Sequence, residues 1–191
     1  GIIGEIKLEA TAKDYIESLR VVPDLAQKEA ITTLSIFHSG ETEQQAKIEL
    51  SASAWNTSET HTPKNKTYEI TLNPGQNRIV LKYPMGEKVQ LWSEFNPALY
   101  KLTAELKAGE STDNLQTDFG FREFSTSGTQ FTINGISTFL RGDHNACVFP
   151  LTAYPPMNVE HWQELFQNAK SYGINHYRYH SWTPPKAAFI V

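Results

Sequence analysis

The sequence predicts a mainly β protein, in which an immunoglobulin-like β-sandwich is followed by a strand, helix, strand unit of a second domain. Two observations support this prediction. Up to about residue 140, most of the chain consists of short segments in which apolar and polar residues alternate, separated by Gly, Pro, Asn and Ser. Alternation with a period of two places one side of each strand on a core and the other in water. Near residue 158 the apolar spacing changes to three and four residues, the period of a helix.

The alternating segments predict a sandwich that spans about residues 12–124. The turn sequences "NPGQN" (73–77) and "KAGES" (107–111) come at intervals that suit two packed antiparallel sheets, although the cysteine pair of antibody domains is missing. Acidic residues such as Asp14 and Glu17 are expected on solvated faces. The segments expected to be strands are "ITTLSIF" (31–37), "AKIELSAS" (46–53), "TYEITL" (67–72), "RIVLKY" (78–83), "LYKLTAEL" (99–106) and "LQTDFGFRE" (115–123).

A hairpin is predicted at the start of the second domain, which we place at about residue 125. In "QFTINGISTFLRG" (130–142), Asn134 and Gly135 supply the tight turn, because both residue types accept the backbone angles that short hairpin turns need. The strand after the turn is expected to end at Arg141.

The segment "NVEHWQELFQNAKSYG" (158–173) predicts a helix, with Asn158 capping its start and Gly173 ending it. A strand from Ile174 follows at once. Strand, helix, strand is typical of a parallel sheet with a right-handed crossover, which cannot share the antiparallel sheets of a sandwich. The second domain is therefore of a different type from the first.

The overall charge and the single cysteine argue against several function classes. The 191 residues include 17 basic and 21 acidic ones, and a formal net charge of -4 speaks against a nucleic-acid partner or an anionic membrane surface. No apolar stretch is long enough to span a bilayer, and the first residues lack the pattern of a signal peptide. With Cys147 alone, neither an internal disulfide nor a cysteine metal cluster can form, and no metal or cofactor is expected.

Polar residues crowd the end of the last predicted strand, in "GINHYRYHSWTPP" (173–185). A buried strand that served only packing would consist mainly of Val, Ile and Leu, because each polar group taken from water costs free energy unless it finds a partner. By strand parity, His176, Arg178 and His180 share one side. His176 lies deeper along the strand, so we expect it to make a structural hydrogen bond.

Four segments, in order, resemble the landmarks of glycoside hydrolase family two, which includes β-galactosidases, β-glucuronidases and β-mannosidases. They are "LWSEFNPALYKLTAEL" (91–106), "FGFREF" (119–124), "FTINGISTFLRG" (131–142) and "GINHYRYH" (173–180). The opening "GIIGEIKLEA" is similar to the last strand of the family's jelly-roll domain. The resemblance implies three parts: the end of a jelly roll (1–11), a sandwich (12–124), and the first β-α-β portion of a (β/α)8 barrel (125–191).

The barrel that the resemblance implies would present its strand ends to the substrate, because active sites of such barrels form at the carboxyl ends of the strands. Arginine and amide groups suit sugar hydroxyls, and flat aromatic faces suit sugar rings. Each candidate also has a purely structural alternative: pairing with a neighbouring polar group, packing of the loop, or a backbone turn. The substrate-binding candidates are Arg178, His180, Trp182, Asp143, His144 and Asn145.

The match departs from the galactosidase pattern at both strand ends. That pattern places a histidine three residues after the arginine, whereas His180 follows Arg178 by two, and Ala146 stands at the position of the first-strand histidine. The resemblance therefore does not imply specificity for β-galactosides, and a different glycan as the substrate is an equally open alternative.

The resemblance implies an enzyme of carbohydrate metabolism that hydrolyses O-glycosyl compounds by a retaining mechanism with two carboxylates. Both glutamates belong to later barrel strands, so no catalytic residue is assigned within this chain, and the chain alone is expected to be inactive. Carbohydrate is the expected partner, with self-association through an exposed barrel surface.

The alternative is a noncatalytic immunoglobulin-like module for carbohydrate or protein binding, which would have no reason to begin a barrel. The cellular location stays open, with a periplasmic or secreted bacterial protein favoured.

Overall fold

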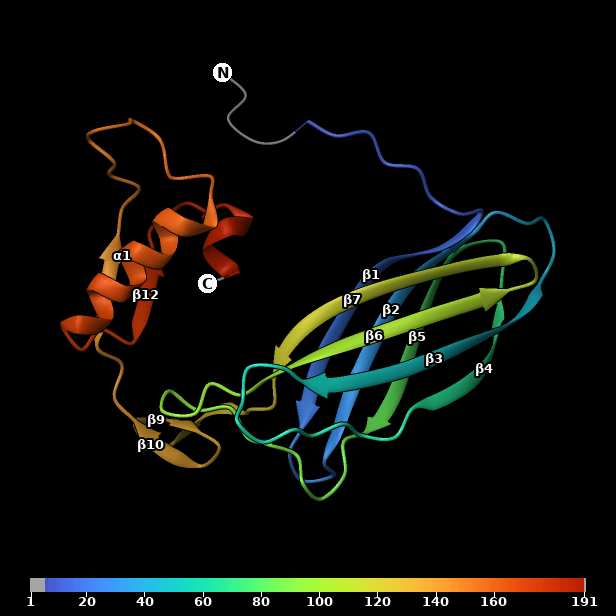
Figure 1. Ribbon diagram of the computed structural model, residues 1–191, viewed down its shortest axis with the longest axis horizontal. Helices are drawn as coiled ribbons and strands as arrows, with labels where there is room; N and C mark the ends of the chain where they lie inside the picture. Colours follow the sequence, from blue (N-terminus) through green and yellow to red (C-terminus); the bar gives the residue numbers. More distant parts are fainter. Residues whose placement is uncertain (1–5, 191) are drawn as a thin grey trace. The chain divides into compact units, whose positions relative to one another are not determined.

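The computed structural model describes residues 6–190, which form two compact units (Figure 1). The larger unit is Glu9–Ser137, and the smaller one contains the chain from Thr138 onward together with residues 6–8. The strand expected at residues 1–11 falls partly on residues 1–5, which lie outside the described residues, and residues 6–12 form neither helix nor strand. Because the units divide after Ser137, the hairpin that we assigned to the second domain groups with the sandwich.

The larger unit is a β-sandwich, so the prediction of a mainly β protein is confirmed. One antiparallel sheet has the order β1-β2-β5 and the other the order β4-β3-β6-β7. The strands of the two sheets are labelled in Figure 1. They are β1 (Asp14–Asp24), β2 (Glu29–His38), β3 (Gln44–Ala54), β4 (Lys66–Leu72), β5 (Gly75–Pro84), β6 (Leu99–Ala108) and β7 (Ser111–Gly120).

The core of the sandwich follows from the two-residue alternation. In β2 every second side chain, from Ala30 to His38, is buried, and β3 and β6 alternate in the same way. Both sheets contribute to one apolar cluster, which explains why the alternating segments were sufficient to predict a two-layer fold. Its fully enclosed members include Leu34, Ile36, Ile48, Leu50, Leu72, Tyr83, Tyr100, Leu102 and Leu106.

Strand β1 was not among the predicted strands. Its pairing register with β2 shifts between Ile16 and Ser18, and the neighbouring Glu17 and Ser18 are both exposed. A bulge of this kind interrupts the alternation that identifies a strand in a sequence. The expectation for Asp14 was wrong as well, because this residue lies at the start of β1 with only 5% of its surface exposed.

The predicted hairpin turn at Asn134 and Gly135 is confirmed. Both residues have positive φ angles, 53° and 78°, between β9 (Gln130–Ile133) and β10 (Ile136–Thr138). Strand β8 (Phe124–Ser127) pairs with the other side of β9. The Asn134 side chain donates to the Trp92 carbonyl at 2.9 Å and accepts from the Glu123 amide at 2.9 Å, which ties the turn to the preceding loop.

The smaller unit contains β11 (Gly142–Asn145), α1 (Val159–Ser171), β12 (His176–Tyr179) and a 3-10 helix, η1 (Lys186–Phe189). The helix prediction is confirmed in detail: the Asn158 side chain accepts from the His161 amide, and Gly173, with φ +80°, follows the last turn. Strands β11 and β12 pair in parallel, as the strand, helix, strand order indicated. Neither helix within residues 6–190 is long and apolar enough to cross a membrane.

The strand before α1 begins later than expected. We predicted that it would end at Arg141, but β11 starts at Gly142, so Asp143, His144 and Asn145 lie in the strand and not beyond it. Asn175 explains where the pairing starts: its amide donates to the Arg141 carbonyl at 3.0 Å, and its side chain accepts from the Arg141 amide at 2.8 Å. The spacing of apolar residues in a sequence does not reveal a hydrogen bond of this kind.

Candidate functional site

The two faces of the β11–β12 pair differ in chemistry. Tyr177 and Tyr179 lie on the face that packs on α1, with ring centroids 5.1 Å from Phe166 and 6.4 Å from Trp162 respectively. Because side chains alternate along a strand, Arg178 projects to the opposite face. The helix thus covers the aromatic side and leaves the polar side open.

Three of the predicted site residues meet on this open face. Arg178 pairs in register with His144 on the neighbouring strand, and its Nη1 lies 3.0 Å from His144 Nε2. The His144 ring lies 5.1 Å from the ring of His180, measured between centroids. The His180 amide continues the strand pairing by donating to the Asn145 carbonyl at 3.0 Å.

The Arg178–His144 contact sets the protonation pattern of the histidine. A guanidinium has five N–H donors and no acceptor, so His144 Nε2 must accept and cannot carry a proton in this arrangement. Arg178 is exposed, so its remaining N–H groups are accessible to an oxygen-rich ligand.

Side chains alternate between the two faces of β11, so Asp143 and Asn145 lie on the opposite face from His144. The structure therefore does not bring all three together. Asp143 pairs in register with Tyr177. Burial is the main cause that raises the pKa of the Tyr177 phenol, and the charge of Asp143 raises it further. Asn145 has a structural role, because its side chain accepts from the Cys147 amide at 3.0 Å.

Trp182 joins a small apolar cluster. Its indole N–H donates to the Asn145 carbonyl at 3.0 Å, and its ring packs edge-on against Tyr179 and Phe149. At the centre of the cluster is Trp162, which is fully buried and donates to the Pro156 carbonyl at 2.8 Å. The apolar residues around it are Phe149, Val159, Leu165, Phe166, Tyr179, Trp182, Ala187 and Ala188.

The amino-acid sequence identifies the residues of the open face but not their contacts. His176, Arg178 and His180 were assigned to one side by parity, whereas the pairing of Arg178 with His144 depends on the register between two strands that are 34 positions apart at this point. Within residues 6–190, no three His, Cys, Asp or Glu side chains are arranged to hold a metal ion.

Comparisons with known proteins identify the family to which this chain belongs. The family model described as glycosyl hydrolases family 2 matches residues 14–122, and the chain belongs to this family. The resemblance deduced from the four landmark segments is therefore confirmed.

Individual relatives agree with this assignment. Over 153 residues the chain is 28% identical to the β-galactosidase large subunit of Latilactobacillus sakei, a match that covers 74% of this chain and 21% of that protein. The chain thus spans about a fifth of the length of this relative.

Solved structures share the fold at low sequence identity. A β-glucuronidase of Bacteroides uniformis matches with a TM-score of 0.75 at 16% identity, covering 94% of this chain and 23% of that one. A family 2 member of Bacteroides cellulosilyticus matches with a TM-score of 0.76 at 21% identity, covering 93% and 25%. A β-galacturonidase of Eisenbergiella tayi, bound to galacturonate, matches with a TM-score of 0.74 at 18% identity, covering 93% and 30%.

Proposed function

We propose that the chain is the central portion of a glycoside hydrolase that cleaves O-glycosidic bonds in carbohydrate, and that β11, α1 and β12 are the first β-α-β portion of a (β/α)8 barrel. The observation that supports this most strongly is the parallel pairing of β11 with β12, which follows a sandwich of the family and leaves His144, Arg178 and His180 on the face opposite α1. In a (β/α)8 barrel the helices form the outer ring, so the face opposite the helix lines the interior.

The chemistry of the open face suits a sugar. The outer N–H groups of Arg178 can donate to two neighbouring hydroxyl oxygens, and His144, held by Arg178 through Nε2, presents its Nδ1–H as a further donor. His180 lies beside His144 at the end of β12 and adds a second imidazole. In this proposal the three residues bind and orient the substrate, while Trp182 and Asn145 support the loops around them.

The proposed chemistry is the retaining mechanism, in which one carboxylic acid protonates the leaving oxygen and a carboxylate about 5 to 5.5 Å away attacks the anomeric carbon. Asp143 is a carboxylate on β11 itself, but it pairs in register with Tyr177, so the alternation of side chains directs it to the face that packs on α1. The proposal therefore assigns neither catalytic carboxylate to residues 6–190. It also holds that the 191-residue chain has no hydrolytic activity by itself.

Sugar binding by the 191-residue chain tests the proposal. Saturation-transfer NMR with methyl β-galactoside, methyl β-glucuronide and methyl β-mannoside is expected to show contact with at least one of them. Arg178→Ala should abolish this signal, because it removes the donors of the open face. Lys170→Ala, an exposed cation at the end of α1, is the matched control and should leave the signal unchanged.

Two outcomes would contradict the proposal. If the signal persists in Arg178→Ala, the open face does not bind the sugar, and a binding module in the sandwich becomes the better account. If the purified chain hydrolyses nitrophenyl glycosides, and a single carboxylate substitution within residues 6–190 abolishes that hydrolysis, then a catalytic carboxylate lies in this part of the chain.

A further inference from the structure

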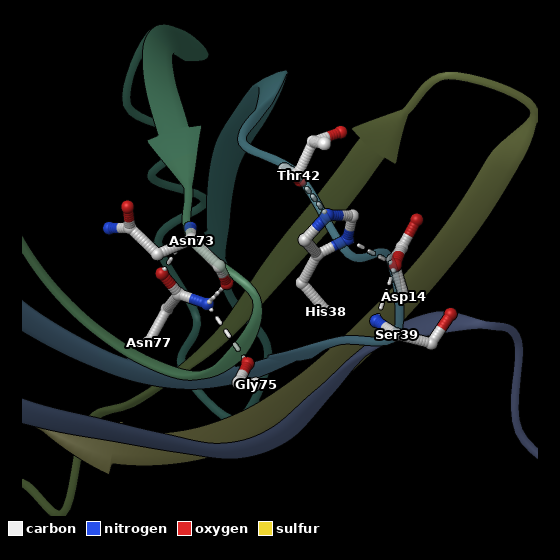
Figure 2. A network of polar contacts seen from close by, with 7 residues as sticks. All are labelled: Asp14, His38, Ser39, Thr42, Asn73, Gly75 and Asn77. Atoms are coloured by element: carbon white, nitrogen blue, oxygen red, sulfur yellow. Dashed lines mark hydrogen bonds and ion pairs between the residues drawn. The ribbon is translucent and has the colours of Figure 1, made fainter.

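A buried ion pair lies in the sandwich, on different elements from the residues of the proposed sugar site (Figure 2). Asp14 begins β1 and His38 ends β2, and the two residues face each other in the strand register. His38 Nδ1 lies 2.7 Å from Asp14 Oδ1, and the residues keep only 3% and 5% of their surface exposed. Nothing in the proposed hydrolytic chemistry uses this pair.

The connection between β2 and β3, residues 39–43, folds around the His38 ring. His38 Nε2 lies 2.9 Å from the Thr42 carbonyl oxygen, and the Ser39 amide donates to Asp14 Oδ1 at 3.1 Å. A Cβ atom at Gly40 would lie 2.6 Å from the ring, so this position has no room for a side chain. Because β2 and β3 belong to different sheets, these residues form a link between the two layers.

The partners of the ring determine its protonation. A carboxylate and a backbone carbonyl can only accept hydrogen bonds, so both ring nitrogens of His38 must donate. A neutral imidazole has a single N–H and can satisfy only one of the two acceptors. The observed geometry thus requires the imidazolium form, and loss of one proton breaks one of the two contacts.

Asp14 is the charged group in contact with the ring, and its charge favours the imidazolium. Further charged groups on the surrounding elements include Asp113 on β7, whose Oδ2 accepts from the Ile16 amide at 2.7 Å, the exposed Glu41 and Glu43 of the connection, and the exposed Lys13 that precedes Asp14. The Asp14 hydrogen bond, followed by the Thr42 carbonyl, raises the pKa of His38, while burial opposes the rise.

We propose that His38 is a proton-operated latch: its imidazolium holds residues 39–43 against β1, and loss of the proton releases this connection while the two sheets stay folded. The sign follows from the raised pKa. A group that binds its proton more tightly in the closed state stabilises that state fully below its ordinary pKa of about 6.5, and this stabilisation is lost as the pH rises through the raised value. The latch is therefore closed in mildly acidic solution and opens toward alkaline pH.

Millisecond hydrogen exchange of the whole chain between pH ~6 and ~9, corrected for the intrinsic rates, tests the latch. In the wild type, protection of peptides that cover residues 39–43 should fall with rising pH, by up to about tenfold for each unit by which the pKa differs between the closed and open states. Peptides from β3 and β6 should show no such loss.

Two variants sharpen the test. His38→Gln cannot titrate, so its protection at residues 39–43 should be low and independent of pH. His61→Gln is the matched control and should behave as the wild type, because His61 is a partly buried histidine elsewhere in the sandwich, bonded to the Tyr100 hydroxyl at 2.7 Å beyond the far end of β3. The latch would be refuted by corrected protection that is independent of pH in the wild type, or by the same pH dependence in His38→Gln.

A measurement on the wild type alone covers the case in which His38→Gln does not fold. Nitrogen-15 chemical shifts of the His38 ring at pH ~6.5 should show protons on both Nδ1 and Nε2. A ring with one unprotonated nitrogen at that pH, in the folded protein, would overturn the proposal.

Discussion

Arg178 Nη1 lies 3.0 Å from His144 Nε2, across the parallel strands β12 and β11. The contact joins the ends of two strands that are separated by a loop, a helix and a second loop. Through this contact the two side chains form one polar surface with a defined arrangement of hydrogen-bond donors. This surface is the structural basis of the proposed sugar site.

The Arg178–His144 contact predicts the tautomer of the histidine. Nitrogen-15 NMR of the neutral imidazole should show the His144 proton on Nδ1, because Nε2 accepts from Arg178. Arg178→Met removes the donor and should yield a mixture of tautomers. Arg20→Met, at an exposed position of β1, is the control. A dominant Nε2–H form in the wild type would show that the contact is absent in solution.

Acid should destabilise the sandwich through Asp14. Burial alone would raise the pKa of this carboxyl group, but the His38 side chain and the Ser39 amide lower it overall. The stabilisation is thus present above the ordinary value of about 3.9 and is lost as the pH falls through the lowered value. Urea unfolding at a series of pH values should show a free energy of unfolding that declines in this acidic range.

The variant Asp14→Asn isolates this contribution. It removes the counter-ion of the His38 imidazolium, so the ring gives up a proton and one of its two hydrogen bonds, and at pH ~7 we expect a loss of about 1 to 3 kcal/mol in the free energy of unfolding. Asp118→Asn, at an exposed position of β7, is the control and should change this free energy by less than ~0.5 kcal/mol. Equal effects of the two substitutions would show that the Asp14–His38 pair does not stabilise the fold.

Asn77 should hold the turn between β4 and β5. Its buried side chain accepts from the Asn73 amide at 2.8 Å and donates to the carbonyls of Asn73 and Gly75 at 2.8 and 3.0 Å. Asn77→Ala leaves these backbone groups without their partner, so we expect a loss of about 1 to 3 kcal/mol in urea unfolding. Asn73→Ala is the matched control, because Asn73 takes part only through its backbone. A loss of the same size in the control would contradict this account.

The smaller unit should depend on Trp162. Trp162→Ala removes the centre of its only apolar cluster within the described residues, at a cost of about 3 to 5 kcal/mol. Limited proteolysis should then cut rapidly between residues 145 and 190, while the sandwich stays intact. Trp55→Ala, which truncates a tryptophan with 54% of its surface exposed, is the control. Unchanged resistance in Trp162→Ala would show that the cluster does not hold this unit together.

Much of the secondary structure was predictable because its causes are local. The helix at Val159–Ser171 follows from apolar spacing and from the cap at Asn158, and the hairpin turn follows from Asn134 and Gly135. Strand β1 was missed because its bulge between Ile16 and Ser18 breaks the alternation. Where local geometry is regular, the pattern of residue types carries the information, and where it is irregular the pattern fails.

The candidate site was predictable as a set of residues and not as an arrangement. Parity within one strand placed Arg178 and His180 on the same side, and the structure agrees with that assignment. Asp143, His144 and Asn145 were treated as one group because β11 was expected to end before them. Because these residues lie in a strand, their side chains alternate, so His144 lies on one face and Asp143 and Asn145 lie on the other.

By itself, the sequence determined the mainly β class, the membership of a family of glycoside hydrolases, and the residues that crowd the end of the last strand. Only the tertiary structure decided which polar groups meet, Arg178 with His144 and Asp14 with His38, across 34 and 24 positions of the chain. The reason is physical: periodicity and capping depend on neighbours along the chain, whereas these contacts depend on strand register, which the packing of the whole unit sets.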